Sequence, residues 1–301
     1  MRKKYKLYQV DAFTKARFKG NPAGVVSNAE GLMDEQMQAI ARELNNSETA
    51  FIFPSDSTDY DVRVRFFTPT TEVPTCGHAT VAAHYVRAIE NQLPTCTVWQ
   101  KIGIGTLPVD IIQINNDYHI VMTQGKVEFL ELIESDFKER LLSAFNLRPI
   151  DIDERCPIQH VSTGGSKIII GIKSQTKLNS FNPNLNLLTE LNQIILNKGY
   201  FVFTFDSDNP KILTNARMFA PQIGINEDPV TGNGNGPLGA YLVYHKLVTH
   251  DGKQFQFKSQ QGEAIGRVGV AHVSVDIQNN EPVKVRVGGD AVIAFQTEIE
   301  V

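Results

Sequence analysis

The chain has 301 residues and a net charge of −4, from 29 Lys and Arg against 33 Asp and Glu. It is 42% hydrophobic and 21% charged, which is typical of a globular protein long enough for two domains. No basic block stands out, and no run approaches the ~20 apolar residues of a membrane helix. We therefore expect neither nucleic acid nor membrane as a partner.

Cysteine usage indicates the compartment. Cys76, Cys96 and Cys156 form an odd, sparse set without CxxC spacing, so a disulfide framework is not expected. The basic start "MRKKYK" is not followed by an apolar stretch, so we expect no signal peptide. A reducing cytoplasm is the predicted location.

The first half predicts strands and helices in a regular order. One helix, residues 33–45, carries Met37, Ile40, Ala41 and Leu44 on one face. The remaining elements are strands over residues 5–13, 20–27, 48–54 and 60–69, and a helix over residues 79–89 that follows a turn.

The second half repeats this order. A helix over residues 184–197 places Leu188, Leu191, Ile194 and Ile195 on one face. The domain boundary is expected within residues 125–150, in a charged helix over residues 128–146. The tail, residues 281–301, reads as two strands in a hairpin. The other predicted strands cover residues 158–165, 166–173, 200–205 and 216–221.

Two glycine-containing turns align without a gap. Residues 72–78, "EVPTCGH", precede residues 227–233, "EDPVTGN", by 155 positions, and each turn is expected to begin a helix. A single long repeat indicates two similar domains related by a pseudo-twofold axis. The binding site is expected in a cleft between these domains.

The start of a helix presents unpaired N–H groups and a partial positive charge, which suits a carboxylate or a developing oxyanion. Gly77 with His78, and Thr231 with Gly232 and Asn233, would each form such a place. Neither turn matches a nucleotide-binding glycine motif. The pattern therefore favours a small carboxylic acid as ligand.

Cys76 has two interpretations. A helix start favours a thiolate nucleophile, whereas free cysteine more often packs as a small apolar group. Cys76, His78 and His84 could suggest a metal site, but two histidines six positions apart on a helix point in different directions. We expect no metal.

Two carboxylates are also ambiguous. Glu48 begins an apolar strand, where a partly desolvated carboxyl group could carry a proton in both directions. It could equally be an exposed turn residue together with Ser47. Asp228, before Pro229, is either a residue that starts a helix or an acid beside the ligand.

Four motifs resemble one family. These are "GNPAGVV", "ARELNNSETAFI", "FFTPTTEVPTCGHATVAAHYV" and "RMFAPQIGINEDPVTGNGNGPLGAYL". They are similar to the PhzF-like isomerases of phenazine biosynthesis, and within these to the YddE-type branch, which share the diaminopimelate epimerase-like fold.

The resemblance implies an α+β fold of two similar domains, each a β-barrel-like sheet around a central helix. The central helices would be residues 79–89 and 237–246. The first domain would be residues 1–125 with a returning strand at residues 287–301, and the second domain residues 126–286. Dimers are common in the family, so a homodimer is implied.

The resemblance also assigns residues. The family's catalytic glutamate falls on Glu48, its histidine on His78 and its second-domain aspartate on Asp228. Of the two cysteines that work in related epimerases, one position is Cys76 and the other is Thr231. The Glu-Arg pair that grips an α-amino carboxylate in epimerases falls on Ala220 and Pro221.

The predicted function is an isomerase that transfers a proton on a small carboxylate-bearing, unsaturated or cyclic metabolite, without a cofactor. Its catalytic residues would be Glu48, His78 and Asp228. The alternatives are an epimerase or racemase that uses Cys76, and a non-catalytic metabolite-binding protein. The predicted substrate-binding residues are Ser47, Cys76, Gly77, Thr231, Gly232 and Asn233.

Overall fold

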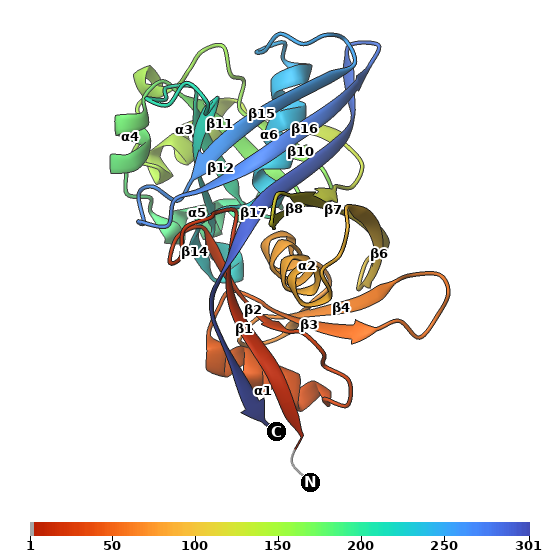
Figure 1. The fold of residues 1–301 in the computed structure, drawn as a ribbon. Coiled ribbons are helices and arrows are strands. Elements are labelled where there is room, and N and C mark those ends of the chain that lie inside the picture. Colours follow the sequence, from red (N-terminus) through yellow and green to blue (C-terminus); the bar gives the residue numbers. More distant parts are fainter. Residues whose placement is uncertain (1–2) are drawn as a thin grey trace. The chain divides into compact units, whose positions relative to one another are not determined.

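The computed structural model describes residues 3–301, so the first two residues of the basic N-terminal stretch lie outside the described residues. The chain forms two compact units. Unit 1 comprises the described residues up to Thr123 together with Gly288–Val301, and unit 2 is Gln124–Val287. Figure 1 shows the ribbon of both units.

Unit 1 contains two helices, α1 (Asp34–Leu44) and α2 (Gly77–Asn91). Its strands are β1 (Lys4–Ala12), β2 (Asn21–Val26), β3 (Thr49–Pro54), β4 (Val62–Phe67), β5 (Glu72–Val73), β6 (Cys96–Ile102), β7 (Gly105–Ile114), β8 (Asp117–Thr123) and the second part of β17 (Glu281–Glu300).

The strands of unit 1 close into a barrel. Among the described residues, eight strands pair in the ring β17–β1–β2–β3–β4–β6–β7–β8 and back to β17. Within this ring β2–β3 and β4–β6 are parallel, and β17–β1, β1–β2, β3–β4, β6–β7 and β7–β8 are antiparallel. Helix α2 packs against β1, β2, β3, β7 and β8, and its residues from His78 to Val86 are all buried.

Unit 2 contains α3 (Ser135–Ala144), α4 (Gln175–Ser180), α5 (Leu185–Asn192), α6 (Gly232–Tyr244) and the 3-10 turns Pro149–Asp151 and Pro221–Ile223. Its strands are β9 (Glu128–Leu132), β10 (Gln159–Ser162), β11 (Lys167–Ile172), β12 (Tyr200–Thr204), β13 (Thr214–Ala220), β14 (Ile225–Asp228), β15 (Gln254–Gln261), β16 (Gly269–Gln278) and the first part of β17.

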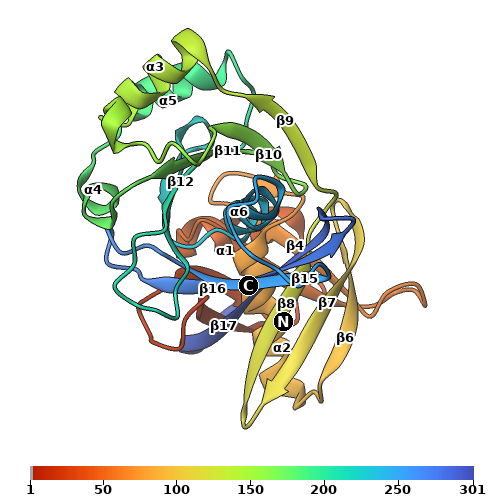
Figure 2. The same cartoon turned by 90° about the horizontal axis from the view of Figure 1, so that it is seen from above.

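The pairing of unit 2 repeats that of unit 1. The order is β9–β10–β11–β12–β13–β15–β16–β17, with β11–β12 and β13–β15 parallel. Helix α6 packs against β10, β11 and β16, as Figure 2 shows. The predicted fold of two similar α+β domains, each with a sheet around a central helix, is confirmed.

Glycine lets α6 lie this close to its sheet. A Cβ at Gly234 would stand 2.4 Å from the Phe201 ring, and one at Gly239 would stand 2.7 Å from Val273. The helix is apolar on all sides, as an enclosed helix must be. Its first residue is Gly232, so the prediction that it begins at Pro237 is wrong; Pro237 lies inside it.

Helix α2 also extends beyond its predicted ends, from Gly77 to Asn91. The predicted helix over residues 184–197 is too long, because α5 ends at Asn192 and Ile194 is 57% exposed. The predicted charged helix over residues 128–146 is wrong in its first part: Glu128–Leu132 is strand β9, which pairs with β10, and only Ser135–Ala144 is helical.

The predicted hairpin in the tail is also wrong. Residues 281–300 form one continuous strand, β17, and the hairpin lies before it, at Asn279 and Asn280 with φ of 53° and 63°. Gly288 and Gly289 are not a turn. They allow close contact, since a Cβ at Gly289 would stand 2.3 Å from the Phe13 ring.

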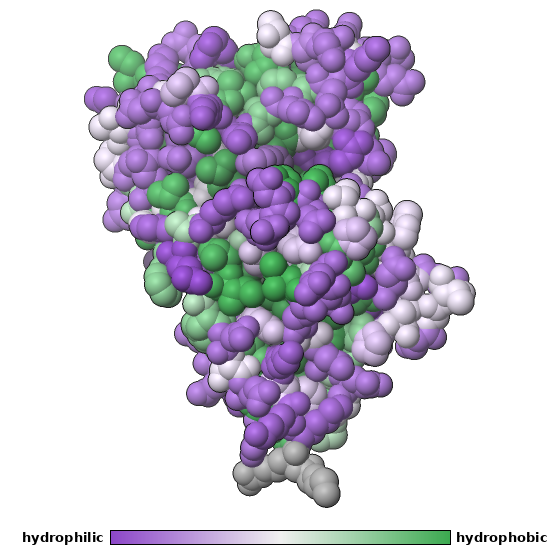
Figure 3. All heavy atoms as spheres, viewed as in Figure 1, coloured by the Kyte–Doolittle hydropathy of each residue, from purple (hydrophilic) through white to green (hydrophobic). Residues whose placement is uncertain are grey.

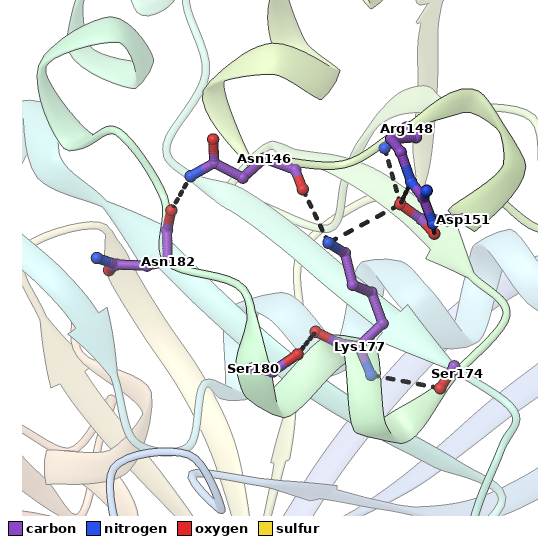
Figure 4. Close-up of polar contacts among 7 residues, drawn as sticks. All are labelled: Asn146, Arg148, Asp151, Ser174, Lys177, Ser180 and Asn182. Carbon is purple, nitrogen blue, oxygen red and sulfur yellow. Dashed lines mark hydrogen bonds and ion pairs between the residues drawn. The ribbon is translucent and has the colours of Figure 1, made fainter.

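Polar groups cover much of the surface. In Figure 3 hydrophilic residues occupy most of the visible face, with apolar residues in smaller areas. Figure 4 shows one surface network in unit 2, in which Lys177 Nζ donates to the Asn146 carbonyl at 2.9 Å and Arg148 pairs with Asp151 at 3.3 Å. No helix within residues 3–301 is long and apolar enough to cross a bilayer.

An Arg–Glu pair fixes the chain just before each central helix. In unit 2, Arg217 on β13 donates two bonds to Glu227 on β14, at 2.9 and 2.7 Å, and both side chains are buried. Arg217 also donates to the carbonyls of Leu178 and Phe181. In unit 1, Arg65 on β4 makes the same two-pronged pair with Glu72 on β5, both at 2.7 Å.

We expect Arg217→Met to destabilise the protein by about 3–5 kcal/mol, because it leaves the Glu227 carboxylate buried without its partner. The free energy of unfolding in urea measures this. Arg148→Met is the control and should change stability little, because Arg148 is 76% exposed and its partner Asp151 keeps Lys177 at 3.9 Å (Figure 4). Equal effects of the two substitutions would contradict the importance of the buried pair.

Candidate active site

The start of α2 carries three of the predicted site residues. Cys76 is the residue before the helix, with an extended backbone (φ −151°, ψ 123°), and Gly77 is its first residue. His78 follows and is 6% exposed, because α2 is enclosed by the barrel. The Cys76 carbonyl accepts bonds from the N–H and the hydroxyl of Thr80, which fixes the turn against the helix.

Glu48 and Ser47 lie between α1 and β3 and reach the same histidine. Glu48 directly precedes β3, whose residues Ala50 and Phe51 are fully buried. Its carbonyl accepts from the Gly24 N–H at 3.3 Å, which holds its backbone against β2. Its side chain is 14% exposed, so it is not the exposed turn residue of the alternative interpretation.

The His78 ring has a carboxylate, a hydroxyl and a thiol as neighbours. Its Nε2 lies 3.4 Å from Glu48 Oε2 and 3.2 Å from Ser47 Oγ, and its Nδ1 lies 3.4 Å from Cys76 Sγ. When Glu48 is ionised its carboxylate can only accept a hydrogen bond, so a ring proton on Nε2 would face it and Nδ1 would accept from the Cys76 thiol. The arrangement can pass a proton from one side of the ring to the other.

Glu48, Cys76 and His78 also form the one group of described His, Cys, Asp and Glu residues that could hold a metal ion, with ligand atoms within 4.8 Å of one another. Distances of this size are those between the ligands of a single ion, so the thiol, the imidazole and the carboxylate could hold one metal together. The absence of a metal stays a prediction.

His84 lies elsewhere on α2. Its Nε2 is 2.9 Å from Gln100 Oε1, and burial lowers the pKa of His84 to about 4. It is a neutral residue of the barrel interior, pointing away from His78 as the sequence predicted.

The start of α6 carries the predicted residues of unit 2. Thr231 precedes the helix, and its hydroxyl donates to Asp228 Oδ2. Asp228 is the last residue of β14 and does not start the helix. Gln261 ties the turn together: its amide donates to the Asp228 carbonyl at 2.7 Å and to Thr231 Oγ1 at 3.1 Å.

Gly232 and Asn233 open α6, where the first N–H groups have no acceptor within the helix. Gln124 Nε2 donates to the Gly232 carbonyl at 2.9 Å and to Asn233 Oδ1 at 3.3 Å. Within unit 1, therefore, the structure brings together Ser47, Glu48, Cys76 and His78 beside Gly77. Within unit 2, it brings together Asp228 and Thr231 beside Gly232 and Asn233.

Lys167 is a residue that the sequence analysis missed. It is the first residue of β11 and is only 3% exposed. Burial lowers the pKa of Lys167 to about 7, while the charge of Asp228 opposes this shift. Its place in "GGSKIIIG", at the start of an apolar strand, was the available signal. Gln261 and Gln124 had no comparable signal.

Comparison with known proteins identifies the family. The family model described as phenazine biosynthesis-like protein (PhzC-PhzF) matches residues 10–297. The chain belongs to this family.

Three similar proteins show which members of the family the chain resembles. An uncharacterized isomerase of Clostridium acetobutylicum is 58% identical over 99% of both chains. The uncharacterized isomerase YddE of Escherichia coli is 48% identical over 98% of both chains. A crystal structure of a PhzF family protein from Bacillus anthracis has a TM-score of 0.90 at 30% identity and covers 99% of this chain and 100% of its own.

These matches confirm the predicted resemblance to PhzF-like proteins of the YddE type. They also confirm the prediction that the chain is an enzyme of the isomerase class.

Lys167 should make stability depend on pH. In the unfolded chain its ammonium has the ordinary pKa of about 10.4, so between about pH 7 and 10 the unfolded state binds more protons than the folded state. Below pH 7 the buried Lys167 is charged and destabilises the folded state by its full amount. As pH rises from about 7 to 10 the folded state loses this penalty. Stability therefore rises with pH.

We expect the free energy of unfolding of the native protein, relative to Lys167→Met, to rise by a few kcal/mol from pH 7 to pH 10, because each pKa unit corresponds to about 1.4 kcal/mol. Urea unfolding at several pH values measures the difference. Lys173→Met, at a half-exposed lysine, is the control and should give no such change. A constant difference between the native protein and Lys167→Met would show that Lys167 is charged in the fold.

Proposed function

We propose that the protein isomerises a small carboxylate-bearing, unsaturated or cyclic metabolite by moving a proton between two carbon atoms. The observation that carries this proposal is the largely buried Glu48 carboxyl group, 3.4 Å from the His78 ring. A carboxyl group in such a place has few competing water contacts and a partner that can share its proton.

Glu48 is the proposed principal acid/base. It would take a proton from one carbon, leaving the electron pair delocalised over the unsaturated carboxylate, and return the proton at another carbon. The fixed backbone between β2 and β3 keeps the carboxyl group in place during both steps. No cofactor is required by this sequence of steps.

His78 is proposed to hydrogen-bond Glu48 in its charged and in its protonated form. When the carboxylate is charged, the Nε2–H can donate to it, and Ser47 Oγ lies 3.2 Å from the same nitrogen. The N–H groups of Gly77 and the first turn of α2 would hold the substrate carboxylate or the negative charge that develops on it.

In unit 2, we propose that the first N–H groups of α6, at Gly232 and Asn233, likewise favour an anion. Asp228 would tune the charge at this turn, since its carboxylate accepts from Thr231 and lies near Lys167. Asp228→Asn should therefore lower activity without removing Glu48 chemistry.

One observation favours the alternative of an epimerase or racemase. Cys76 Sγ lies 3.4 Å from His78 Nδ1, so the thiol could give up its proton to the ring and act as an acid/base itself. The position that corresponds to the second cysteine of epimerases is Thr231, whose hydroxyl is far too weak an acid for that role. We therefore favour Glu48.

The partners are also proposals. A small anionic metabolite follows from the two helix starts, and the −4 net charge without a basic block offers no support for nucleic acid. A cytoplasmic homodimer without a membrane partner follows from the family resemblance and from the cysteine usage.

We expect Glu48→Gln to lower the rate of proton exchange by a factor of about 10²–10⁴, because glutamine keeps the shape but cannot shuttle a proton. Uptake of solvent deuterium into a panel of small unsaturated and cyclic carboxylic acids measures this. Cys76→Ser is the matched control and should retain most of the exchange, also after thiol alkylation of the native protein. An inactive Cys76→Ser beside an active Glu48→Gln would establish the cysteine mechanism instead.

We also expect exchange to persist after dialysis against EDTA, with metal content well below one ion per chain, because the proposed proton transfer uses the Glu48 carboxyl group and needs no metal. Elemental analysis of the purified protein and the same deuterium assay test this. Loss of exchange that zinc restores would show that Glu48, Cys76 and His78 bind a catalytic metal.

A further inference from the structure

A cavity lies within unit 1, at the end of α2 that is remote from His78. Its volume is about 390 Å³, within the range of ~300–1,000 Å³ that small-molecule sites occupy. It is bounded by the residues that follow β2, by the end of β3, by the start of β4 and by the last turns of α2. Its polar lining consists of Ser27, Asn28, Ser55, Asp61, Arg87 and Glu90, with Asn91 at the helix end.

Arg87 is the cation of this cavity. Its Nη1 is buried and has no hydrogen-bond partner among the described residues. Burial lowers the pKa of Arg87, and the nearby charge of Asp61 opposes that shift. A buried N–H group of a guanidinium is costly to leave without an acceptor. We therefore take this nitrogen as evidence for a ligand atom that accepts a hydrogen bond.

The two carboxylates of the cavity differ. Glu90 is already engaged, because its Oε1 accepts from the Tyr8 hydroxyl at 2.6 Å and the Ser27 hydroxyl at 3.3 Å and lies 3.4 Å from Lys6 Nζ. Asp61 accepts only from the backbone N–H of Trp99, at 2.7 Å, among the bonds described for its side chain. Asp61 and Arg87 thus attract each other without forming an ion pair of the described chain.

We propose that this cavity binds an α-amino acid, with the ligand carboxylate at Arg87 and its ammonium group at Asp61. A dianion such as phosphate would meet repulsion from Asp61 and Glu90, and a simple cation would meet repulsion from Arg87. A zwitterion satisfies both charges at once. The planar guanidinium suits a carboxylate, and Ile52, Phe53 and Val62 give the cavity an apolar part for a side chain.

This site is separate from the proposed acid/base residues. Arg87 follows His78 by nine residues, so the two lie about 13 Å apart along the axis of α2 at ~1.5 Å per residue. The inference goes beyond the proposed isomerase reaction and does not depend on it. Glu48→Gln should therefore bind the amino acid as the native protein does.

The test is calorimetric titration of the full-length protein with glycine, L-serine, L-leucine and L-glutamate, and with acetate, methylammonium and phosphate as compounds that lack one or both charges. We expect saturable binding of at least one amino acid, and at least about tenfold weaker binding of every control compound. Arg87→Met should weaken the amino acid at least about tenfold, which is the effect of losing a hydrogen bond to a charged group.

Two further variants make the result specific. Arg87→Lys keeps the charge but lacks the two parallel N–H donors of a guanidinium, so it should bind the amino acid more weakly than the native protein. It also serves in place of Arg87→Met if that variant fails to fold. Arg42→Met removes an exposed arginine on α1, outside the cavity lining, and should bind normally. Absence of amino-acid binding, unchanged binding in both Arg87 variants, or tighter binding of phosphate or acetate would overturn the proposal.

Discussion

The enclosure of α2 by the barrel of unit 1 is the constraint on which the candidate site depends. A helix with sheet on all sides cannot rotate or slide without losing apolar contacts, so its first turn has a fixed position. His78 is therefore held where Glu48 reaches it from the start of β3. A proton-transfer site needs such fixed distances, since an acid/base group must stay within hydrogen-bond reach in both of its states.

The same constraint recurs in unit 2 with different chemistry. Helix α6 is enclosed through glycines such as Gly234, and the turn before it is held by Gln261, whereas in unit 1 Thr80 bonds the Cys76 carbonyl. The Arg–Glu pair before each helix is kept in both units, although the residues of the two turns have diverged. The duplication thus preserves the support of the turns more closely than the reactive groups on them.

The order of strands and helices could be predicted from the sequence, because apolar periodicity reports which face of an element is buried. The tail could not. Gly288 and Gly289 read as a turn, but glycine serves there to admit neighbouring side chains, which only the folded contacts show. Helix ends were missed for a similar reason: Pro237 reads as a helix start, yet α6 begins five residues earlier.

The predicted site residues came largely from the family resemblance, and the structure shows how those of each unit gather. Lys167 had only a weak signal, its place at the start of an apolar strand, and Arg87 had none, because a lysine or arginine on the surface of an element is usually solvated. Burial distinguishes them in the structure.

The central claim is that Glu48 lies beside Nε2 of His78 and that Cys76 lies beside Nδ1. Nitrogen NMR of the ¹⁵N-histidine-labelled protein tests it most directly, because the shifts of the two ring nitrogens report which of them carries the proton. The structure predicts a protonated Nε2 and an accepting Nδ1 in the native protein, with a change at Nε2 in Glu48→Gln and at Nδ1 in Cys76→Ser. A proton on Nδ1 alone, or ring nitrogens that respond to neither substitution, would contradict the account.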